Sequence, residues 1–449
     1  MKTRDPAKSP CSSETVMDDD VRARRLVRTS ERTRVQIRAG LEGRRRGLAL
    51  MLPFAGPAIV VSVAYLDPGN FAINIQAGAG YGYRLVWVVV LASLMAMMFQ
   101  ALSAKLGIVT GKNLAELCRD HMPRPLALSM WAVSEGAAMA TDLAEFVGGA
   151  VGISLLLRVP LMAGMVITAV VTCALLLFER TGFRPLELAI GALVGVIAVC
   201  YVIELVIQPV AWPRLFASQW PPQLPDDGAV LLACGVIGAT VMPHALFLHS
   251  GLVQRRATPR TPNQRRTLLR YARIEAIVAL GIAAVINVAM VVMAADVFHP
   301  AFAQTADLQS AYHTLGPVLG AAAAGVFLIA LIASGISSSV VGTLAGQMVM
   351  QGFVDFPISV WLRRALTMIP SFLVIGLGVD ATRALVLSQV ALSLALPFPV
   401  TALLWFTSRR AVMGEHRNGA ATSVAAIVSA LAVVALNVAL LIRATDPSG

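Results

Sequence analysis

The sequence predicts an all-α polytopic membrane protein, built as a single bundle of transmembrane helices. The chain has 449 residues, of which 57% are hydrophobic and only 14% are charged, and its mean hydropathy is +0.74. Its apolar runs repeatedly reach about 20 residues, the length that an α-helix needs to cross the hydrocarbon core of a bilayer. A soluble enzyme would not have this composition. We expect the first helix itself to direct the chain to the membrane.

Apolar runs between charged or Pro/Gly-rich breaks predict eleven spans. They cover residues 48–80, 85–107, 126–150, 160–178, 187–207, 228–252, 273–298, 318–350, 361–378, 382–408 and 420–443. The chain is thereby divided into three parts. These are a basic, disordered cytoplasmic tail at 1–47, a membrane core at 48–410, and an extra transmembrane helix with a short C-terminus at 411–449.

The net charge of +11 is concentrated in segments that this prediction places on one side of the membrane. The basic residues there include Arg22, Arg24, Arg25, Arg44, Arg45, Arg46, Lys112, Arg119, Arg124, Arg255, Arg256, Arg260, Arg265, Arg266, Arg270, Arg409, Arg410 and Arg417. The opposite side carries isolated residues such as Arg84 and Arg158. The positive-inside rule then predicts a cytoplasmic N-terminus and, with eleven spans, a C-terminus outside. We expect the tail to contact anionic lipid rather than nucleic acid.

Two predicted spans are interrupted by proline. The first carries Asp67-Pro68-Gly69-Asn70, and the sixth carries Met242-Pro243-His244 deep in an apolar run. Proline removes a backbone donor and crowds the preceding turn, so both helices should unwind and free carbonyl oxygens that suit a cation. Breaks in the first and sixth spans predict two five-helix halves of opposite orientation, with the breaks meeting near the midplane and an eleventh helix outside the repeat.

The side chains at these breaks predict a cation site with both hard and soft ligands. Asp67 is costly inside a membrane, so it requires a partner or a cargo, although it could instead cap the broken helix. Asn70 offers an amide oxygen or a second cap. Met242 alone would usually be packing, but it directly precedes Pro243, and the carbonyl of Ala239 lies three residues earlier on the same face. Carboxylate, amide, carbonyl and thioether together favour a transition-metal ion over Mg²⁺ or Ca²⁺.

Four motifs resemble the Nramp family of proton-coupled metal transporters. They are DPGN in the first span, GATVMPH at 238–244, ATDLAE at 140–145 and SGISSSVVGTLAGQMVMQGF at 334–353, and the resemblance covers about residues 50–410.

This resemblance implies a LeuT-type inverted repeat in the membrane core. It also implies Asp67, Asn70, Ala239 (through its carbonyl) and Met242 as metal ligands, with Gln389 approaching the metal in some states. The expected cargo is Mn²⁺ or Fe²⁺ with H⁺ symport into the cytoplasm, across the plasma membrane of a bacterium. We expect no resident cofactor, and the sequence identifies no protein partner.

Span three carries an acidic stripe that suits proton transfer. Glu135, Asp142 and Glu145 are spaced by seven and three residues, so they lie along one side of a helix. Carboxyl groups in a low-dielectric environment can exchange protons near neutral pH. Arg363 and Arg364 of span nine are expected partners, since in the family an acidic residue of span three with an arginine of span nine resembles a proton exit route. The alternative is a buried structural ion-pair network.

Three further polar residues are candidates for the pathway. His244 follows the break in span six, and we expect a proton or pathway role for it, because histidine carries protons near neutral pH. His249 is a weaker candidate for the same reason, and a satisfied core histidine is the alternative for both. Asn287 on span seven is a candidate gate residue or a helix-packing hydrogen bond. Pro68, Gly69 and Pro243 are expected to shape the gates at the breaks.

Other functions compete with this prediction. A magnesium or other cation transporter or uniporter on the same fold is the closest alternative, and a carrier of organic substrates is another. Met242 argues against Mg²⁺, because a thioether offers it little, and Asp67 would repel a substrate carboxylate. An intramembrane metallohydrolase would need a motif such as HExxH, which the sequence lacks. A receptor would not need two broken helices in matching positions of two repeats.

Overall fold

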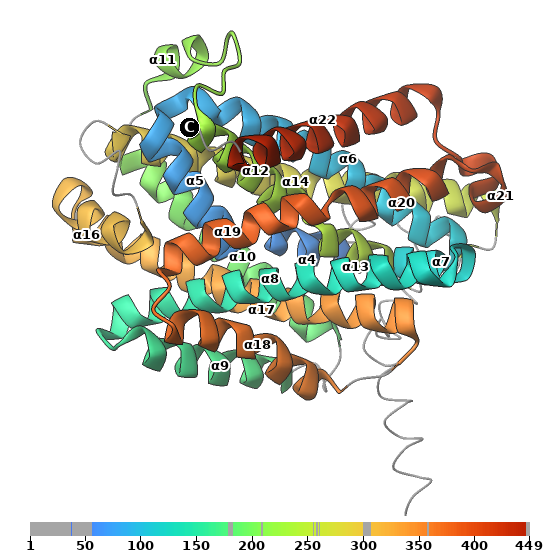
Figure 1. Cartoon of the computed structure of the whole chain (residues 1–449), viewed down its shortest axis with the longest axis horizontal. Coiled ribbons are helices and arrows are strands. Elements are labelled where there is room, and N and C mark those ends of the chain that lie inside the picture. Colours follow the sequence, from blue (N-terminus) through green and yellow to red (C-terminus); the bar gives the residue numbers. More distant parts are fainter. Residues whose placement is uncertain are drawn as a thin grey trace, which may run out of the picture.

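The fold is a bundle of long helices, shown in Figure 1. The computed structural model describes residues 56–177, 183–207, 210–254, 261–299, 307–356 and 359–445, together with residues 37, 256 and 259. Within these residues all regular structure is helical. The predicted basic tail at 1–47, apart from Ile37, lies outside the described residues, and so does the predicted start of the first span at 48–55.

Every predicted span coincides with a described helix or pair of helices. In chain order these are α4 (Pro57–Ala64) with α5 (Pro68–Tyr81), α6 (Val86–Thr110), α8 (Arg124–Leu157), α9 (Leu161–Leu177), α10 (Phe183–Ile207), α12 (Asp227–Val241) with α13 (Pro243–Gln254), α14 (Pro262–Val297), α17 (Ala321–Val354), α18 (Val360–Gly376), α19 (Ala381–Ala395) with α20 (Pro397–Ser408), and α22 (Ala420–Thr445). Short elements that the sequence analysis did not predict are η1 (Gly82–Leu85), α7 (Leu114–His121), α11 (Trp212–Ala217), α16 (Leu308–Leu319), α21 (Arg410–Met413) and η3 (Gly414–His416).

The composition of these helices is that of a multi-pass membrane protein. Seven helical stretches in the described part of the chain are long and apolar enough to cross a membrane, and one of them, Pro68–Thr110, includes α5, η1 and α6. Two shorter apolar stretches lie at Leu161–Leu175 and Leu188–Glu204. Large apolar side chains are also exposed on the outside of the bundle, with Val206 at 78%. Lipid contact accounts for such exposure, because an apolar surface is stable in hydrocarbon.

The two interrupted spans are broken as predicted. α4 ends at Ala64 and α5 begins at Pro68, while α12 ends at Val241 and α13 begins at Pro243. Proline at the first position of a helix is favourable, because its missing N–H would have no intrahelical partner there. Each span therefore consists of two half-helices that meet inside the bundle.

The tenth span carries a local irregularity without being interrupted. α19 and α20 meet at Leu396, whose backbone angles are helical, and residues Ala381–Ser408 form one stretch long enough to cross a membrane. Pro397 lacks an N–H and cannot donate to the carbonyl one turn earlier, so one hydrogen bond of the helix is missing there. The single span predicted at 382–408 is confirmed.

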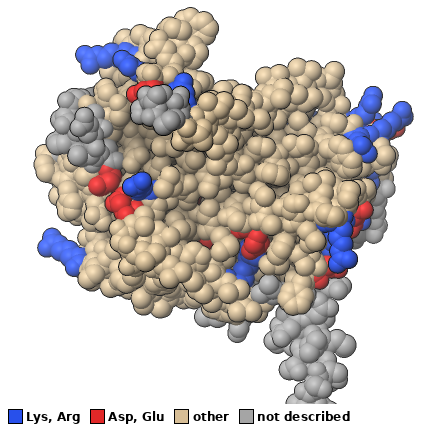
Figure 2. Space-filling view, in the orientation of Figure 1, with Lys and Arg blue, Asp and Glu red and all other residues tan. Residues whose placement is uncertain are grey.

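One 34-residue helix from each half lies at the centre of the bundle. α8 and α17 lie side by side, with α9 and α18 on one flank, while α22 lies at the opposite edge (Figure 1). α22 buries few of its residues, among them Asn437, whose amide exchanges hydrogen bonds with the hydroxyl and the carbonyl of Ser393 on α19. α16 lies at one end of the bundle, and α7 and α21 lie at the other. On the face in Figure 2, Lys and Arg side chains gather mainly toward these two ends.

Candidate functional site

Asp67 is the N-cap of α5, the second half-helix of the first span, and is fully buried. Its Oδ1 atom accepts hydrogen bonds from the backbone N–H of Asn70 at 2.8 Å and from the Asn70 side-chain amide at 2.7 Å. The helix-cap alternative is therefore realised by one carboxylate oxygen. The other oxygen, Oδ2, has no hydrogen-bond partner in the described part of the chain. A cap and a ligand are compatible in the same residue.

Asn70 connects the two broken spans. Its Nδ2 atom donates to the carbonyl oxygen of Ala239 on α12 at 3.1 Å as well as to Asp67. Its own Oδ1 atom has no partner among the described residues. Three of the predicted ligands, Asp67, Asn70 and Ala239, are thus joined in one hydrogen-bonded cluster across the breaks.

Gln389 of α19 lies against the same break. A Cβ atom added to Gly69 would overlap the Gln389 side-chain amide and would lie 3.0 Å from Oδ2 of Asp67. Only glycine leaves room here for both groups. Gln389 Oε1 is likewise without a partner in the described structure, so three buried oxygens of the predicted set are unsatisfied. Because each such atom costs about 1–3 kcal/mol, the arrangement is suited to a cation that would engage them.

Met242 is held in an unusual backbone conformation. It ends α12 with a φ of 41°, is fully buried, and is followed at once by Pro243. A positive φ in a residue with a long side chain costs of order 1–3 kcal/mol and persists only where the surroundings enforce it. The break in span six is therefore a strained turn as well as a proline effect.

Two backbone carbonyls at the break of the first span accept hydrogen bonds from side chains of neighbouring helices. The Asn287 side chain of α14 donates to the carbonyl of Tyr65 at 2.8 Å, and the Ser334 hydroxyl of α17 donates to the carbonyl of Leu66. Asn287 also accepts from Asn74 at 2.8 Å. The expectation that unwinding would leave free carbonyls was wrong for these two, because neighbouring helices supply donors. Of the two alternatives for Asn287, the hydrogen bond between helices is present.

The acidic stripe of α8 faces α18 and α17. Arg363 Nη2 lies 2.6 Å from Glu135 Oε1, and Arg364 Nη1 lies 3.5 Å from Asp142 Oδ1. Arg364 is also bound by α17, since its guanidinium donates to the Ser339 hydroxyl and, at 3.4 Å, to that of Thr343. Two of the three predicted carboxylates are thus paired, as in the ion-pair alternative.

Glu145 differs from its two neighbours on the stripe. It is fully buried, and neither carboxyl oxygen has a partner in the described part of the chain. A Cβ atom on Gly342 of α17 would overlap this carboxyl and would lie 3.0 Å from Asp142 Oδ1. The missing side chain at Gly342 therefore creates the space in which both acids lie. An unpaired carboxyl beside a paired one can take up and release a proton.

The two histidines of α13 are buried and face different helices. His244 Nδ1 lies 3.1 Å from the Thr141 hydroxyl, next to Asp142 on α8, while His249 Nδ1 lies 3.0 Å from Gln100 Oε1 on α6. Gln100 in turn donates to the Tyr65 hydroxyl at 2.6 Å. The Nε2 atom of each histidine has no partner among the described residues. In each ring, therefore, only one of the two nitrogen atoms has a hydrogen-bond partner among the described residues.

Several residues around the site were not predicted. They are Tyr65, Gln100, Thr141, Ser334, Ser339, Thr343 and Gly342. The available signal was a polar residue inside an apolar run, which requires a hydrogen-bond partner in a membrane. That signal identifies the residue but not its partner, because the partner lies on another helix.

The ends of the broken spans that lie away from the site are tied together. The Tyr81 hydroxyl at the end of α5 donates to Asp226, whose carboxylate also caps α12 by accepting from Ala229 N–H at 2.8 Å. Hydrogen bonds lower the pKa of Asp226 below its usual range. The bond from the Tyr81 hydroxyl has the largest effect, and the bond from the Ala229 N–H has the next largest. The Tyr83 hydroxyl similarly donates to Asp296 of α14. These contacts join α5, α12 and α14 at one end of the bundle.

Comparison with known sequences gives a match over most of the chain. Residues 58–443 match a family model described as "Natural resistance-associated macrophage protein-like", Nramp. A protein of Verminephrobacter eiseniae named "Divalent metal cation transporter MntH" is 63% identical over 414 residues, which is 92% of this chain and 94% of that protein. A protein of Deinococcus radiodurans with the same name is 50% identical over 395 residues, or 87% and 90% of the two chains.

Solved structures confirm the predicted fold. A manganese transporter of Eremococcus coleocola superposes with a TM-score of 0.80 at 32% identity, covering 88% of this chain and 87% of that one. Mhp1, a nucleobase-cation-symport-1 family transporter, superposes with a TM-score of 0.59 at 12% identity, covering 87% and 91%. The second likeness concerns the fold alone. The all-α fold of LeuT type, with its first and sixth helices broken, is confirmed.

Proposed function

The chain belongs to the Nramp family, and from this premise we propose that it imports divalent transition-metal ions, Mn²⁺ foremost and Fe²⁺ also, with proton symport. The family match covers residues 58–443, and relatives at 63% identity carry the name divalent metal cation transporter. Family and relatives are transporters and not enzymes. The metal and the proton are cargo in this proposal, and it includes no resident cofactor.

One observation carries the choice of cargo. Asp67 Oδ2, Asn70 Oδ1 and Gln389 Oε1 are buried oxygens without partners among the residues that the structure describes, and they belong to one cluster that includes the Ala239 carbonyl. The charged member of this cluster is Asp67, and no group of three or more His, Cys, Asp or Glu side chains in the described residues could hold a metal. A site with one charge and neutral oxygens binds a divalent ion weakly enough to release it, as transport requires.

Met242 supports a transition metal over Mg²⁺. It lies at the break of span six, three residues after Ala239, where its thioether would add a soft ligand to the oxygens. A thioether is a soft ligand, which transition-metal ions accept more readily than Mg²⁺ or Ca²⁺ does. The manganese transporter of Eremococcus coleocola, which shares 32% identity with this chain, supports Mn²⁺ as the first ion to test.

The proton partner is inferred from the second polar region. Glu145 is unpaired beside the Asp142–Arg364 pair, and His244 contacts Thr141 on the same helix. A divalent ion arriving at Asp67 would favour the charged form of that carboxyl, so a proton held there would leave toward α8. Metal entry and proton transfer would then be coupled by electrostatics. Coupling is not required energetically, since a potential of 100 mV already supplies about 4.6 kcal/mol to a divalent ion.

The orientation completes the proposal. The positive-inside rule places the N-terminus in the cytoplasm and the C-terminus outside, in the inner membrane of a bacterium. Rocking of the two repeats about the breaks would then expose the Asp67 cluster to each side in turn. Ions would move inward, because the membrane potential is negative on the cytoplasmic side.

Uptake into proteoliposomes tests this function. The purified protein is reconstituted, and entry of Mn²⁺ is recorded together with internal pH, with Mg²⁺ and Ca²⁺ as competitors. We expect Mn²⁺ entry with acidification of the lumen and weak competition by Mg²⁺. Metal entry without acidification would remove the symport and leave a uniporter. Transport of Mg²⁺ as fast as Mn²⁺ would favour the magnesium alternative instead.

A further inference from the structure

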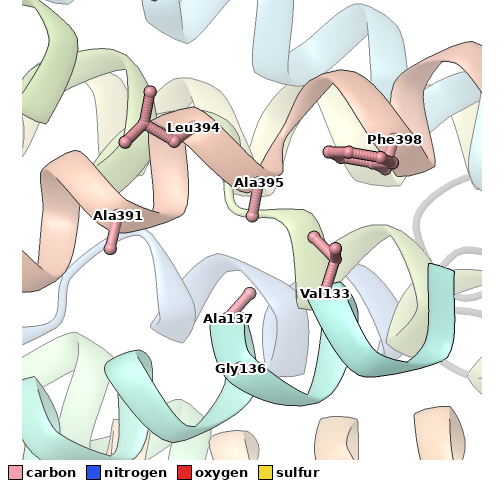
Figure 3. Close-up of a pocket in the computed structure, with 7 residues that line it drawn as sticks. All are labelled: Val133, Gly136, Ala137, Ala391, Leu394, Ala395 and Phe398. Atoms are coloured by element: carbon pink, nitrogen blue, oxygen red, sulfur yellow. The ribbon is translucent and has the colours of Figure 1, made fainter. Parts of the chain in front are cut away.

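An apolar groove runs along the surface between α8 and the α19–α20 pair. It consists of two adjoining cavities of about 310 Å³ and about 480 Å³, which share Phe398 in their walls. In the smaller one, Val133 and Ala137 of α8 point toward α19 and α20, and Ala395 points back toward α8 (Figure 3). The larger cavity continues past Leu126 to Trp405.

Small side chains produce the hollow. Gly136, Ala137, Ala391 and Ala395 leave the space between the two helices unfilled. Along α8 the lining extends from Leu126 to Ala137, about 17 Å at 1.5 Å per residue. One leaflet contributes about 15 Å to the hydrocarbon core. The groove is therefore long enough to receive a lipid acyl chain from one leaflet.

Two arginines lie next to residues that line the Trp405 end of the groove: Arg124 follows Pro123 in sequence, and Arg409 lies over Trp405. Arg124 is exposed and forms no ion pair in the described part of the chain, and the guanidinium of Arg409 lies 3.8 Å from the centroid of the Trp405 ring. The neighbouring acid Asp120 is already paired with Lys112 and Arg119. α8 begins at Arg124 without a side-chain cap, so its free N–H groups and its dipole also favour an anion.

We propose that this groove binds one anionic phospholipid, with an acyl chain between α8 and α19–α20 and its phosphate between Arg124 and Arg409. The predicted topology places this end at the cytoplasmic surface, where basic residues attract anionic headgroups. An acyl chain suits the narrow apolar part, and a phosphate suits the two arginines. α8 belongs to the first repeat and α19–α20 to the second. A lipid bound here would therefore contact both bodies that the proposed transport cycle moves.

Native mass spectrometry of the detergent-solubilised protein tests the binding directly. Phosphatidylglycerol and phosphatidylcholine with identical acyl chains are added in turn. We expect one phosphatidylglycerol to be retained by the wild type, and retention to fall at least about tenfold for the double variant Arg124→Gln, Arg409→Gln, since two charges are removed. Arg383→Gln, at the other end of α19 and also exposed, serves as the matched control and should retain the lipid.

A second variant tests the apolar part of the groove. Ala391→Phe replaces an exposed side chain, so the fold should tolerate it, and its ring would fill the smaller cavity. We expect it to lose the lipid while both arginines remain. Equal retention of the two lipids by the wild type, or unchanged retention in both groove variants, would overturn the proposal. A dimer that dissociates in Ala391→Phe would overturn it too, by assigning the groove to a second copy of the chain.

These measurements do not depend on transport. The lipid-binding proposal can therefore be wrong while the proposed metal import is right, and the reverse also holds. A further uptake series with increasing phosphatidylglycerol in the vesicles would then show whether the bound lipid changes the rate, with Ala391→Phe as the insensitive reference.

Discussion

Two polar regions are buried in this bundle, and they are constructed differently. The first, at the breaks, joins Asp67, Asn70, Ala239 and Gln389 and has one ionisable group among neutral oxygens. The second, between α8, α17 and α18, has three carboxyl groups and two guanidinium groups, and of these five groups only the Glu145 carboxyl has no partner among the described residues.

The difference in charge suits the first region to binding a metal cation and the second to transferring a proton. Neutral oxygens with unused lone pairs can bind a cation and release it, whereas a nearly balanced set of fixed charges would trap one ion or exclude another. A balanced set with one unpaired acid instead suits a proton, which adds to a single oxygen and needs no coordination shell. Variants in the two regions should therefore affect metal transport and proton transfer to different degrees.

The largest effect is expected for Asp67→Asn. The substitution keeps the shape and the cap of α5 but removes the only charge at the breaks. Losing one partner of a buried charge pair costs about 2–5 kcal/mol, so Mn²⁺ uptake should fall at least about 30-fold. The matched control is Asp227→Asn, an exposed acid paired with Arg443, which should transport normally. Uptake at the wild-type rate in Asp67→Asn would place the metal elsewhere.

Gly342→Ala should affect the second region more than the first. The added methyl group would overlap Glu145 and crowd Asp142, and overpacking of this kind costs about 1–3 kcal/mol. We expect proton flux to fall more than Mn²⁺ binding, measured by internal pH and by equilibrium metal binding. Gly325→Ala on the same helix is the control, because nothing lies near its Cβ position. If the two variants behave alike, the space at Gly342 has no special role.

Met242→Ala should change selectivity rather than the maximal rate. Removing the thioether leaves only oxygen ligands, which Mg²⁺ and Ca²⁺ also accept. Competition by Mg²⁺ against Mn²⁺ uptake should improve by up to about tenfold, or 1.4 kcal/mol. Met293→Ala, a buried methionine of α14 away from the breaks, controls for loss of packing. A selectivity ratio that does not change would show that the sulfur is not a ligand.

The smallest effect is expected for Ser339→Ala. Its hydroxyl accepts a hydrogen bond from Arg364, so its loss should loosen the guanidinium beside Asp142 without removing a charge. A hydrogen bond to a charged group contributes about 1.5–3 kcal/mol, part of which Thr343 would retain. We expect the pH profile of proton flux to shift while Mn²⁺ affinity stays constant. Ser337→Ala, whose hydroxyl bonds only its own helix, should leave the profile unchanged.

The sequence predicts the helices and their breaks because these depend on local chemistry. Apolar runs define the spans, and Pro68 and Pro243 each open a half-helix where proline is favoured. Pro397 lies in span ten without a polar residue beside it, and there the helix continues through Leu396 with helical backbone angles. A proline alone therefore does not predict a broken span.

Contacts between distant parts of the chain could not be read in the same way. Nothing local indicates that Asn287 and Ser334 would occupy the carbonyls of Tyr65 and Leu66, or that Gly342 would make room for Glu145. These relations depend on how helices pack, and sequence spacing carries no information about the facing helix. The spacing of the three acids predicts that they share one side of α8. It does not predict which of them is paired with an arginine.

The bond from Asn70 to Ala239 bears on the return of the empty carrier. A transporter must return to its starting conformation after releasing its cargo, and a buried carboxylate without hydrogen-bond partners would raise the free energy of that return. Here the Asn70 amide donates to Asp67 and Ala239 at once, so hydrogen bonds within the protein stabilise the carboxylate. An incoming ion would exchange these two hydrogen bonds for coordination once the amide turns its oxygen inward. Asn70 would thereby lower the affinity for the ion, and it would also lower the free-energy cost of the return step without an ion.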